Sequence, residues 1–328
     1  MKHFKVAVLG PIPRDHITTH TGQIIQKYGC ATHTAIALSN LLGDKGTIYP
    51  VTHVRKIDAQ GAKDVFSGYD NINTDHISSE QDQGDVIHLT FLDQNNRVEK
   101  QTAFMPPITP EDVQPLLDCD VFVCVPVTDF EVPLETLQYI KRNSDAMIVF
   151  DAHGPTTALT HQGERVTKFW VDRDRWLPYI DVLKMNLEEA NCSWFKKEYA
   201  TDELAGQDRI NEASLPDFAR HCLSKGLRSL YITLDERGVM VYSLENDKFK
   251  AQHVPPVVVD KVIDTTGCGD SFAGGIAYGL LDGHRNFIRA AQYGNAMGAQ
   301  RTQGKTFEVF KSLEQTDAMI KAGHILGK

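Results

Sequence analysis

The sequence predicts an α/β protein in which helices cover a mostly parallel sheet and a small second sheet is attached. Apolar runs typical of buried strands alternate along the chain with segments of helical period. One segment, from Asp85 to Phe104, alternates apolar and polar residues instead, as a half-exposed hairpin does. The 328 residues show no internal repeat and no low-complexity linker. We therefore expect one core domain with a discontinuous appendage.

The first strands and helix follow from short patterns. FKVAVLG, from Phe4, is an apolar run that predicts a buried strand. Small and apolar residues recur at helical spacing from Ala31 to Leu42, and Gly43 is expected to close that helix. GTIYPVTHV, from Gly46, predicts the next strand.

The middle of the chain continues this alternation. Thr109 is expected to cap a helix with Pro110 at its first position. DVFVCVPV and AMIVFDAHG predict two buried strands, separated by a helix after Pro133. From Thr160 to Tyr179 the sequence is polar and aromatic with weak periodicity, and we interpret it as an insertion without assigned structure.

Two segments are expected to form the small sheet. The segment from Asp85 to Phe104 predicts a hairpin that turns at Asn95-Asn96. ITTHTGQIIQKYG, from Ile17, lacks a helical period and is expected to add strands. Together, residues of about 11–28 and 84–107 predict a small β-sheet lid beside a pocket.

Composition excludes several classes of partner. The formal charge of −9 argues against nucleic acid, because phosphate backbones are bound by clustered Lys and Arg. It does not argue against ATP, which backbone amides, a helix N-terminus and Mg²⁺ can hold. We expect no membrane span and no signal peptide. The six cysteines form no CxxC pair, as expected for reduced thiols in a cytoplasmic protein.

The most informative segment is VIDTTGCGDSFAGG, from Val262. A β-branched run ends at Asp264, small residues follow, and Asp270 is expected to open a helix that runs to about Leu281. Small residues at Gly267, Cys268 and Gly269 let successive backbone amides point outward and form an anion site with the helix dipole. A carboxylate beside that site is suited to take the proton of an alcohol that attacks a γ-phosphate.

Two other interpretations of this segment, and one of a later segment, are weighed against it. Asp270 is also a residue that merely caps helices, although the Gly274-Gly275 pair favours close backbone approach and a functional role. GCGDSFA matches a dinucleotide loop, but an Asp in it would repel a pyrophosphate. AQRTQGKT, from Ala299, matches a loose Walker A pattern but trails a helical stretch, whereas a P-loop follows a strand.

DTTGCGD followed by SFAGG resembles the C-terminal signature of the PfkB carbohydrate kinases, a family that also includes nucleoside kinases. The resemblance extends over nearly the whole chain through VLGPIPRDHI, YGCATHTAIALSNLLG, TDFEVPLETL, KMNLEEA and YITLDERGVMVY. It implies a ribokinase-like three-layer α/β/α sandwich with a small β-sheet lid. Members often pair through the lid strands, so the resemblance also makes a homodimer plausible.

For the acceptor half of the site, the resemblance implies four residues. Asp15 is expected to bind the acceptor's hydroxyl groups, Gly29 and His33 to supply lid-hinge and substrate contacts, and Glu131 to contact the substrate. Each has a simpler explanation: Asp15 as a turn residue, His33 as a packed helix histidine and Glu131 as an acid at a helix start.

For the donor half, Asn186 is implied to approach the phosphates and Glu189 to organise Mg²⁺ through water. Both are equally explained as a capping box. Thr233 and Gly238 are implied to lie near ATP, and Asn295 to border the adenine pocket on a helix that also carries Gly298. The resemblance also implies a monovalent cation near Asp264, with K⁺ expected.

The chain departs from the family pattern at several positions. Tyr28 replaces a usual glycine and His33 a usual asparagine, both in the acceptor half. Cys268 replaces a usual alanine, and Asp235 stands where many members have glycine near the nucleotide phosphates. The segment DAHGPTT, from Asp151, lacks the Asn-x-Arg pattern of many sugar kinases.

The predicted reaction is therefore γ-phosphate transfer from Mg·ATP to a hydroxymethyl group of a sugar or related polyol, with Asp270 as general base. A nucleoside or inositol kinase of the same fold is one alternative, and stacking of a nucleobase on Tyr28 would favour it. A non-catalytic sugar- or nucleotide-binding regulator is another. A dehydrogenase is the third, and the absence of NAD(P)H-dependent turnover would exclude it.

Overall fold

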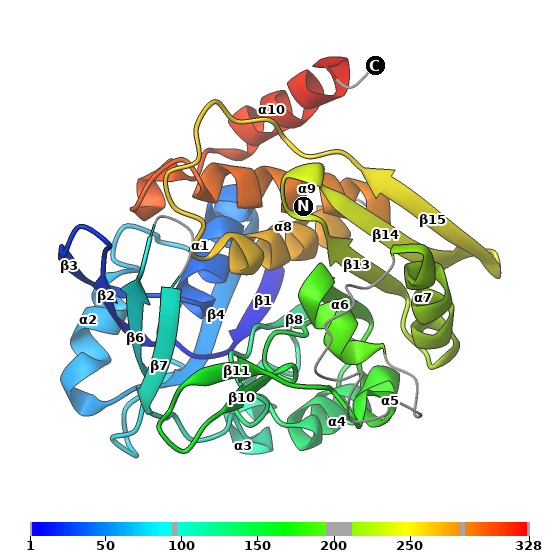
Figure 1. Ribbon diagram of the computed structural model, residues 1–328. Helices are drawn as coiled ribbons and strands as arrows, with labels where there is room; N and C mark the ends of the chain where they lie inside the picture. The colour runs from blue at the N-terminus through cyan, green and yellow to red at the C-terminus, as the bar shows by residue number, and fades with distance from the viewer. Residues whose placement is uncertain (1, 94–96, 195–211, 283–285, 327–328) are drawn as a thin grey trace, which may run out of the picture.

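The computed structural model describes residues 2–93, 97–194, 212–282 and 286–326, and it has the three layers that the sequence predicts (Figure 1). Within these ranges the main sheet has nine strands in the order β15-β14-β13-β12-β9-β8-β1-β4-β5. Its strands are β1 (Phe4–Leu9), β4 (Gly46–His53), β5 (Ile77–Ser78), β8 (Val121–Cys124), β9 (Met147–Asp151), β12 (Val182–Asn186), β13 (Ser229–Thr233), β14 (Val239–Glu245) and β15 (Lys248–Val254).

Helices cover both faces of this sheet. One face carries α1 (Ala31–Leu42), α8 (Cys268–Asp282), α9 (Phe287–Arg301) and, packed on α9, α10 (Leu313–Leu326). The helices of the other face are α3 (Pro110–Val113), α4 (Leu134–Asn143), α5 (Arg173–Trp176), α6 (Leu187–Ser193) and α7 (Leu215–Ser224). The short helix α2 (Ala59–Asp64) lies near β5. The helix at 31–42, the Thr109 cap and the predicted strands are confirmed at these bounds.

The central strands are apolar throughout because both of their faces are buried. In β8, Val121 and Val123 belong to the core under α1, α8 and α9. Phe122 and Cys124 belong to the core on the opposite face. A continuous apolar run in the sequence therefore corresponds to a strand whose side chains pack into the hydrophobic cores on both faces of the sheet.

The sheet places strand ends where a site is expected. From β5 to β13 the strands are parallel, and β14 pairs antiparallel with both β13 and β15. In the sheet β4 lies on one side of β1 and β8 on the other, so the direction in which strands are added reverses at β1. In sheets of this kind, ligands bind outside the carboxyl ends of the strands beside such a reversal.

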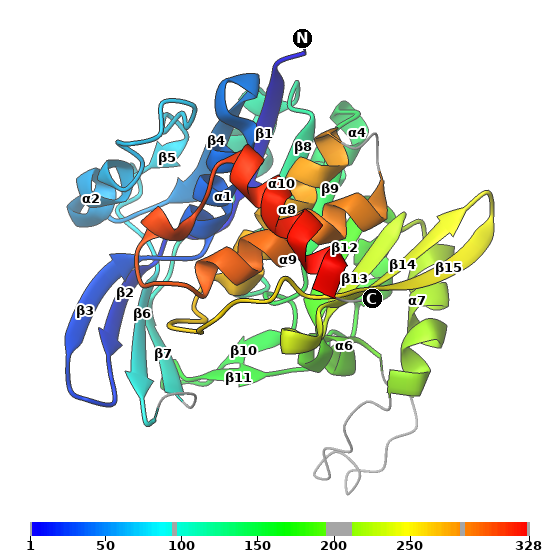
Figure 2. The same ribbon diagram turned by 90° about the horizontal axis from the view of Figure 1, so that it is seen from above.

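The predicted small sheet exists as a separate four-stranded sheet in the order β3-β2-β6-β7 (Figure 2). Its strands are β2 (Arg14–Thr18), β3 (Ile24–Tyr28), β6 (Val86–Phe91) and β7 (Arg97–Ala103). The hairpin pairing of β6 with β7 is antiparallel as expected, while the turn predicted at Asn95-Asn96 lies outside the described residues.

The segment interpreted as an unassigned insertion has structure of its own. β11 (Arg165–Thr167) pairs with β10 (Thr157–Leu159), and α5 follows. The amide of Gln101 in β7 donates to the carbonyl of Gly163 at 2.7 Å, so this hairpin extends the edge of the small sheet. Figure 2 shows β10 and β11 beside the end of β7.

The start of α8 differs from the expectation, and the β-branched run that ends at Asp264 has no regular secondary structure. Helix α8 begins at Cys268, so Asp270 is its third residue rather than its first. Among the helices of the described ranges, α8 included, none is long and apolar enough to cross a bilayer.

Helix α8 lies in backbone contact with its two neighbours, which explains its internal glycines. A Cβ on Gly274 would lie 2.8 Å from the Thr34 carbonyl oxygen of α1. A Cβ on Gly275 would lie 2.5 Å from the Tyr293 carbonyl oxygen of α9. The close backbone approach inferred from this pair is present, and its partners are the helices α1 and α9.

We predict that Gly275→Ala destabilises the protein by about 1–3 kcal/mol, because overpacking against backbone outweighs the gain of about 1 kcal/mol in helix propensity. Chemical denaturation measures this. Gly68→Ala is the control, since nothing lies within 4 Å of a Cβ there. A stabilised Gly275→Ala protein would show that α8 and α9 are not packed at this distance.

Candidate active site

The candidate site lies at the carboxyl ends of β9 and β12, where the N-terminus of α8 approaches the sheet. A Cβ on Gly269 would lie 2.9 Å from the Lys184 Nζ in β12. The Cys30 Sγ, just before α1, lies 3.7 Å from an Asp270 carboxylate oxygen. The predicted anion loop and the predicted base therefore face the strand ends that the topology selects.

The loop presents two of the three predicted amides, and the amide of Asp270 replaces the third. The Cys268 amide donates to the Thr265 carbonyl at 3.2 Å. In the part of the chain that the structure describes, the amides of Gly267, Gly269 and Asp270 have no acceptor. The anion site consequently extends into the first turn of α8, where the helix dipole adds to it.

Asp270 is partly buried and held at two points. The Thr34 hydroxyl donates to its backbone carbonyl at 2.9 Å, and the Cys30 thiol faces its carboxylate. Burial, together with the charge of Asp151, raises the pKa of Asp270 to about 6, against the opposing effects of Lys184 and His153. A carboxylate of this pKa is ionised at neutral pH and is a stronger base than a free Asp.

Lys184 is a site residue that the motifs did not reveal. Its Nζ donates to an Asp151 carboxylate oxygen at 2.7 Å, and both side chains are almost fully buried. Burial lowers the pKa of Lys184, but Asp151 and Glu189 outweigh it and raise that pKa overall. The available signal was a lysine within the apolar strand VLKMN, where a charge needs a buried partner.

Asn186 and Glu189 form the capping box that was the simpler interpretation. The Asn186 side-chain oxygen accepts from the Glu189 amide at 2.7 Å, and a Glu189 carboxylate oxygen accepts from the Asn186 amide at 2.8 Å. The other Glu189 oxygen lies 3.0 Å from the His153 Nδ1. With both oxygens engaged, Glu189 is suited to contact a cation through water rather than directly.

On the acceptor side, Asp15 of β2 faces the same region. Burial raises the pKa of Asp15 to about 7, with Lys27 opposing the shift and both Glu99 and Asp270 adding to it. Asp15 and Asp270 are thus near enough to interact. A Cβ on Gly29 would lie 2.4 Å from an Asp15 carboxylate oxygen, so Gly29 provides the space that this carboxylate needs.

Glu131 directs its carboxylate to groups of the protein itself. It is fully buried, and one of its oxygens accepts from the amides of Val127 and Thr128 at 2.6 and 3.1 Å. Burial and the neighbouring Asp85 raise the pKa of Glu131 well above its usual range. The two carboxyl groups lie between the start of β6 and the loop after β8, and the substrate contact of Glu131 stays a prediction.

His33 and Tyr28 are also turned into the protein. The His33 ring is 1% exposed, and a Cβ placed on Gly267 would lie only 2.5 Å from it. The ring therefore packs directly against the predicted anion loop. Tyr28 is 7% exposed, its hydroxyl lies 3.3 Å from an Asp58 oxygen, and the Arg14 guanidinium covers its ring. Both side chains are therefore enclosed by the protein in this structure, and Arg14 lies over the face of the Tyr28 ring.

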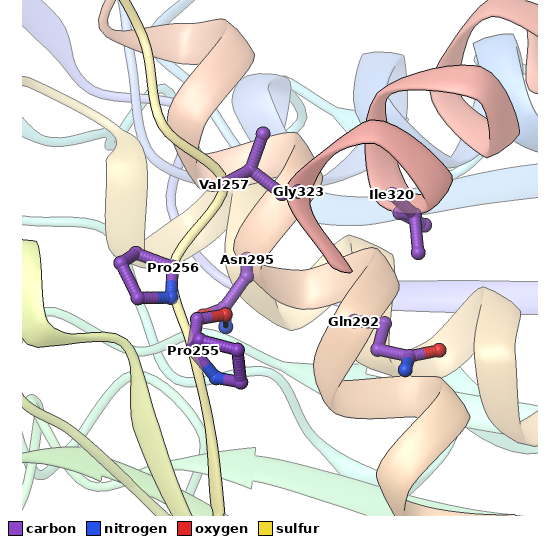
Figure 3. A pocket seen from close by; sticks show the side chains of 7 residues that line it. All are labelled: Pro255, Pro256, Val257, Gln292, Asn295, Ile320 and Gly323. Carbon is purple, nitrogen blue, oxygen red and sulfur yellow. Dashed lines mark hydrogen bonds between the residues drawn. The ribbon is translucent and has the colours of Figure 1, made fainter. Parts of the chain in front are cut away.

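The predicted nucleotide residues gather around the segment after β15. A Cβ on Gly238, which has φ +90°, would collide with the Val254 carbonyl oxygen at 2.3 Å. Asn295 donates to the Pro255 carbonyl at 2.8 Å and lines a narrow pocket between α9, α10 and this segment (Figure 3). Thr233 ends β13, and its hydroxyl reaches the Met185 carbonyl at 3.5 Å.

That pocket is smaller than an adenine ring requires. Its lining residues are Pro255, Pro256, Val257, Gln292, Asn295, Ile320 and Gly323. The space they enclose is about 10 Å³, which holds about one water molecule.

Arg165, from the segment left unassigned in the sequence, also reaches the site. Its Nε lies 3.1 Å from a Glu99 oxygen of β7, and another guanidinium nitrogen lies 3.0 Å from the His153 Nε2. A third contact reaches the Val127 carbonyl at 2.8 Å. Arg165 thereby connects the small sheet to the strand ends, and its charge lowers the pKa of Asp15.

Comparison with known proteins agrees with this geometry. The family model described as pfkB family carbohydrate kinase matches residues 70–306, which is well over half of the chain. The chain belongs to the pfkB family of carbohydrate kinases. The matched range includes Asp270, Lys184 and the anion loop but begins after Asp15.

Individual relatives support the assignment over nearly the full length. Ribokinase of Staphylococcus aureus (strain COL) is 25% identical over 316 residues, which covers 91% of this chain and 93% of that protein. The structure of Arabidopsis thaliana ribokinase complexed with ribose and ATP has a TM-score of 0.69 at 16% identity, covering 98% of this chain and 99% of that one.

A pyrophosphate-dependent kinase in the ribokinase family, complexed with a pyrophosphate analog and myo-inositol, has a TM-score of 0.70 at 18% identity. The match covers 93% of this chain and 98% of that one. At these identities the structures establish the fold alone, which is ribokinase-like as the sequence resemblance implies.

We predict that Lys184→Met lowers the free energy of unfolding by about 3–5 kcal/mol, because it leaves Asp151 buried and unpaired. The double variant Lys184→Met/Asp151→Leu is expected to recover most of that loss, as measured by chemical denaturation. Lys5→Met, which removes an exposed pair with Asp118, is the control and should leave the midpoint unchanged. No recovery in the double variant would contradict the pairing.

Proposed function

We propose that this pfkB-family protein transfers the γ-phosphate of ATP to a hydroxymethyl group of a sugar or related polyol, with Asp270 as general base. The observation that carries the proposal is the position of Asp270. It lies in the first turn of α8, beside amides without acceptors, with its pKa raised to about 6. Lys184 faces Gly269 from the opposite side.

The acceptor would lie between Asp15 and Asp270, the two carboxylates that influence each other across the site. Asp15 would hold its hydroxyl groups, and Asp270 would take the proton of the attacking hydroxyl. The amides of Gly267, Gly269 and Asp270, with the Lys184 ammonium, would stabilise the negative charge of the transferring group. In this proposal Lys184 has a catalytic role in addition to its pairing with Asp151.

Bound Mg²⁺ would neutralise the phosphate charges of ATP. In the described ranges, no group of three or more His, Cys, Asp or Glu side chains is arranged to hold a metal directly. Asp151, Glu189 and Asp270 nevertheless surround Lys184 closely enough to shift its pKa, and this excess of acid suits a divalent cation. Glu189 would contact it through water, and Asn186 would lie near the phosphates.

The small sheet would act as the lid. Asp15 and Lys27 belong to its strands, and Arg165 ties its β7 to His153. Closure would exclude water, which otherwise competes with the acceptor as nucleophile. Pairing of two copies through the outer face of this sheet remains a proposal that the resemblance implies.

An inositol kinase or nucleoside kinase of the same fold is the second candidate. A structural relative was solved in complex with myo-inositol, which supports testing cyclic polyols as acceptors. A nucleobase is disfavoured at Tyr28 because that ring is covered by Arg14 and 7% exposed. That relative's pyrophosphate dependence also makes pyrophosphate a donor to test beside ATP.

We predict that Asp270→Asn lowers acceptor-dependent turnover by at least about 10²-fold without a change of fold. Turnover is measured as ADP release from Mg·ATP, or as phosphate release from pyrophosphate. The acceptors tested are pentoses, hexoses, inositols and nucleosides. Asp217→Asn, which removes an exposed acid from the first turn of α7, is the matched control and should be fully active. Equal activity of Asp270→Asn would make Asp270 only a structural residue, and binding without turnover would favour a regulator.

We predict that kcat/KM falls as the pH drops below about 6, by about tenfold per pH unit, because protonated Asp270 cannot accept a proton. Above that pH the carboxylate is ionised and the rate levels off. A plot of kcat/KM against pH measures this acidic fall. Asp15→Asn should show the same fall at a lower overall rate. A profile with no fall near pH 6 would contradict the role of Asp270.

A further inference from the structure

Asp264 begins the anion loop and is already paired with two cations. One of its carboxylate oxygens lies 3.1 Å from a guanidinium nitrogen of Arg301, and the same oxygen lies 3.4 Å from the Lys27 Nζ. The other oxygen accepts from the Thr266 amide at 2.9 Å. Both oxygens of this carboxylate are therefore used by the protein itself.

Arg301 is fixed in this position from three sides. Its side chain is fully buried, its Nε donates to the His33 Nδ1 at 3.1 Å, and a terminal nitrogen donates to the Gly304 carbonyl at 2.5 Å. Because an Arg cannot lose its charge, a positive charge permanently occupies the space between Asp264 and Gly304.

This arrangement does not fit the K⁺ that the family resemblance implies near Asp264. A bound K⁺ replaces its hydration shell with protein oxygens, and the Asp264 and Gly304 oxygens accept from Arg301 instead. A third cation beside Arg301 and Lys27 would also be repelled at short range, where burial weakens screening. Burial acts to raise the pKa of Asp264, but Lys27, Thr266 and Arg301 outweigh it and lower that pKa to about 2. The protein itself therefore already stabilises the charged form of the Asp264 carboxylate.

We propose that the Arg301 guanidinium, with Lys27 beside it, replaces a monovalent cation at Asp264, so that the enzyme works without K⁺. Arg301 joins Asp264, at the start of the loop, to His33, which lies under Gly267. It therefore holds the loop from both ends, as a bound cation would. Lys27 belongs to β3, so the same cluster also ties the small sheet to the loop.

Two measurements test this, and only the first depends on the proposed function. Turnover of the wild-type protein should be equal, within about twofold, in KCl, NaCl and choline chloride at matched ionic strength. Thermal unfolding of the wild-type protein, which requires no substrate, should show no K⁺-specific rise in Tm. If no acceptor is turned over, the kinase proposal fails while the unfolding measurement still decides this one.

Arg301→Gln is the decisive variant, because it removes the positive charge that pairs with the Asp264 carboxylate. Its Tm should rise by about 2 °C or more in KCl relative to choline chloride. Arg228→Gln is the matched control: Asp181, like Asp264, is paired with one arginine and one lysine, but on another part of the sheet. That variant should lose stability without gaining a K⁺ response.

A K⁺-specific increase in wild-type turnover or Tm would overturn the proposal, and so would a folded Arg301→Gln protein that does not respond to K⁺. If Arg301→Gln does not fold in choline chloride but folds in KCl, the proposal is supported. If it folds in neither salt, the two wild-type measurements decide.

Discussion

The structure depends on the close approach of α8 to its neighbours, because this approach carries the anion loop to the strand ends. Gly274 and Gly275 allow backbone contact with α1 and α9, and a Cβ on Gly279 would lie 2.5 Å from the Ala290 Cα. Three glycines inside one helix cost about 3 kcal/mol in helix propensity. Tertiary packing on both sides offsets this cost, and this packing brings Gly269 close to the Lys184 Nζ.

A second constraint follows from the first, since the loop and the strand ends bring several charges out of water together. Asp151, Glu189 and Asp270 lie around Lys184 at the donor side, and Asp264 lies between Arg301 and Lys27. Buried charges of one sign require partners of the other. Partners that are fixed in this way also provide preorganised electrostatics, which is the main contribution expected from a protein that catalyses phosphoryl transfer.

Local patterns in the sequence predicted most of the fold, for a physical reason. Strands such as β8 and β9 are buried on both faces, so their apolar runs are unambiguous, and the 31–42 helix has both a clear period and a glycine stop. Asp270 and its glycines were found because a carboxylate beside small residues is a local pattern. The same reasoning placed the start of α8 two residues late, since helix ends depend on hydrogen bonds that a pattern does not specify.

Residues that act through distant partners could not be predicted in this way. Lys184 and Asp151 are separated by 33 positions. Glu131 was assigned to the substrate from the family resemblance, which does not reveal that the neighbouring carboxyl group of Asp85 comes from another element. Arg165 lies in a segment without periodicity, so only the pairing of β10 and β11 with the small sheet reveals its position. The resemblance could name the positions of the site, but not which side chains the packing turns inward.

Arg301 shows how such a residue can be hidden by a misleading pattern. It belongs to AQRTQGKT, a segment that attracts attention only as a false phosphate loop, and its partner Asp264 lies 37 positions earlier. Its buried position is explained by its partners, since a guanidinium with a carboxylate, a carbonyl and a ring nitrogen as acceptors is satisfied without water. A bound cation can dissociate, whereas a covalently attached one cannot. The proposed phosphate loop is therefore held by the chain itself, whatever the salt around it.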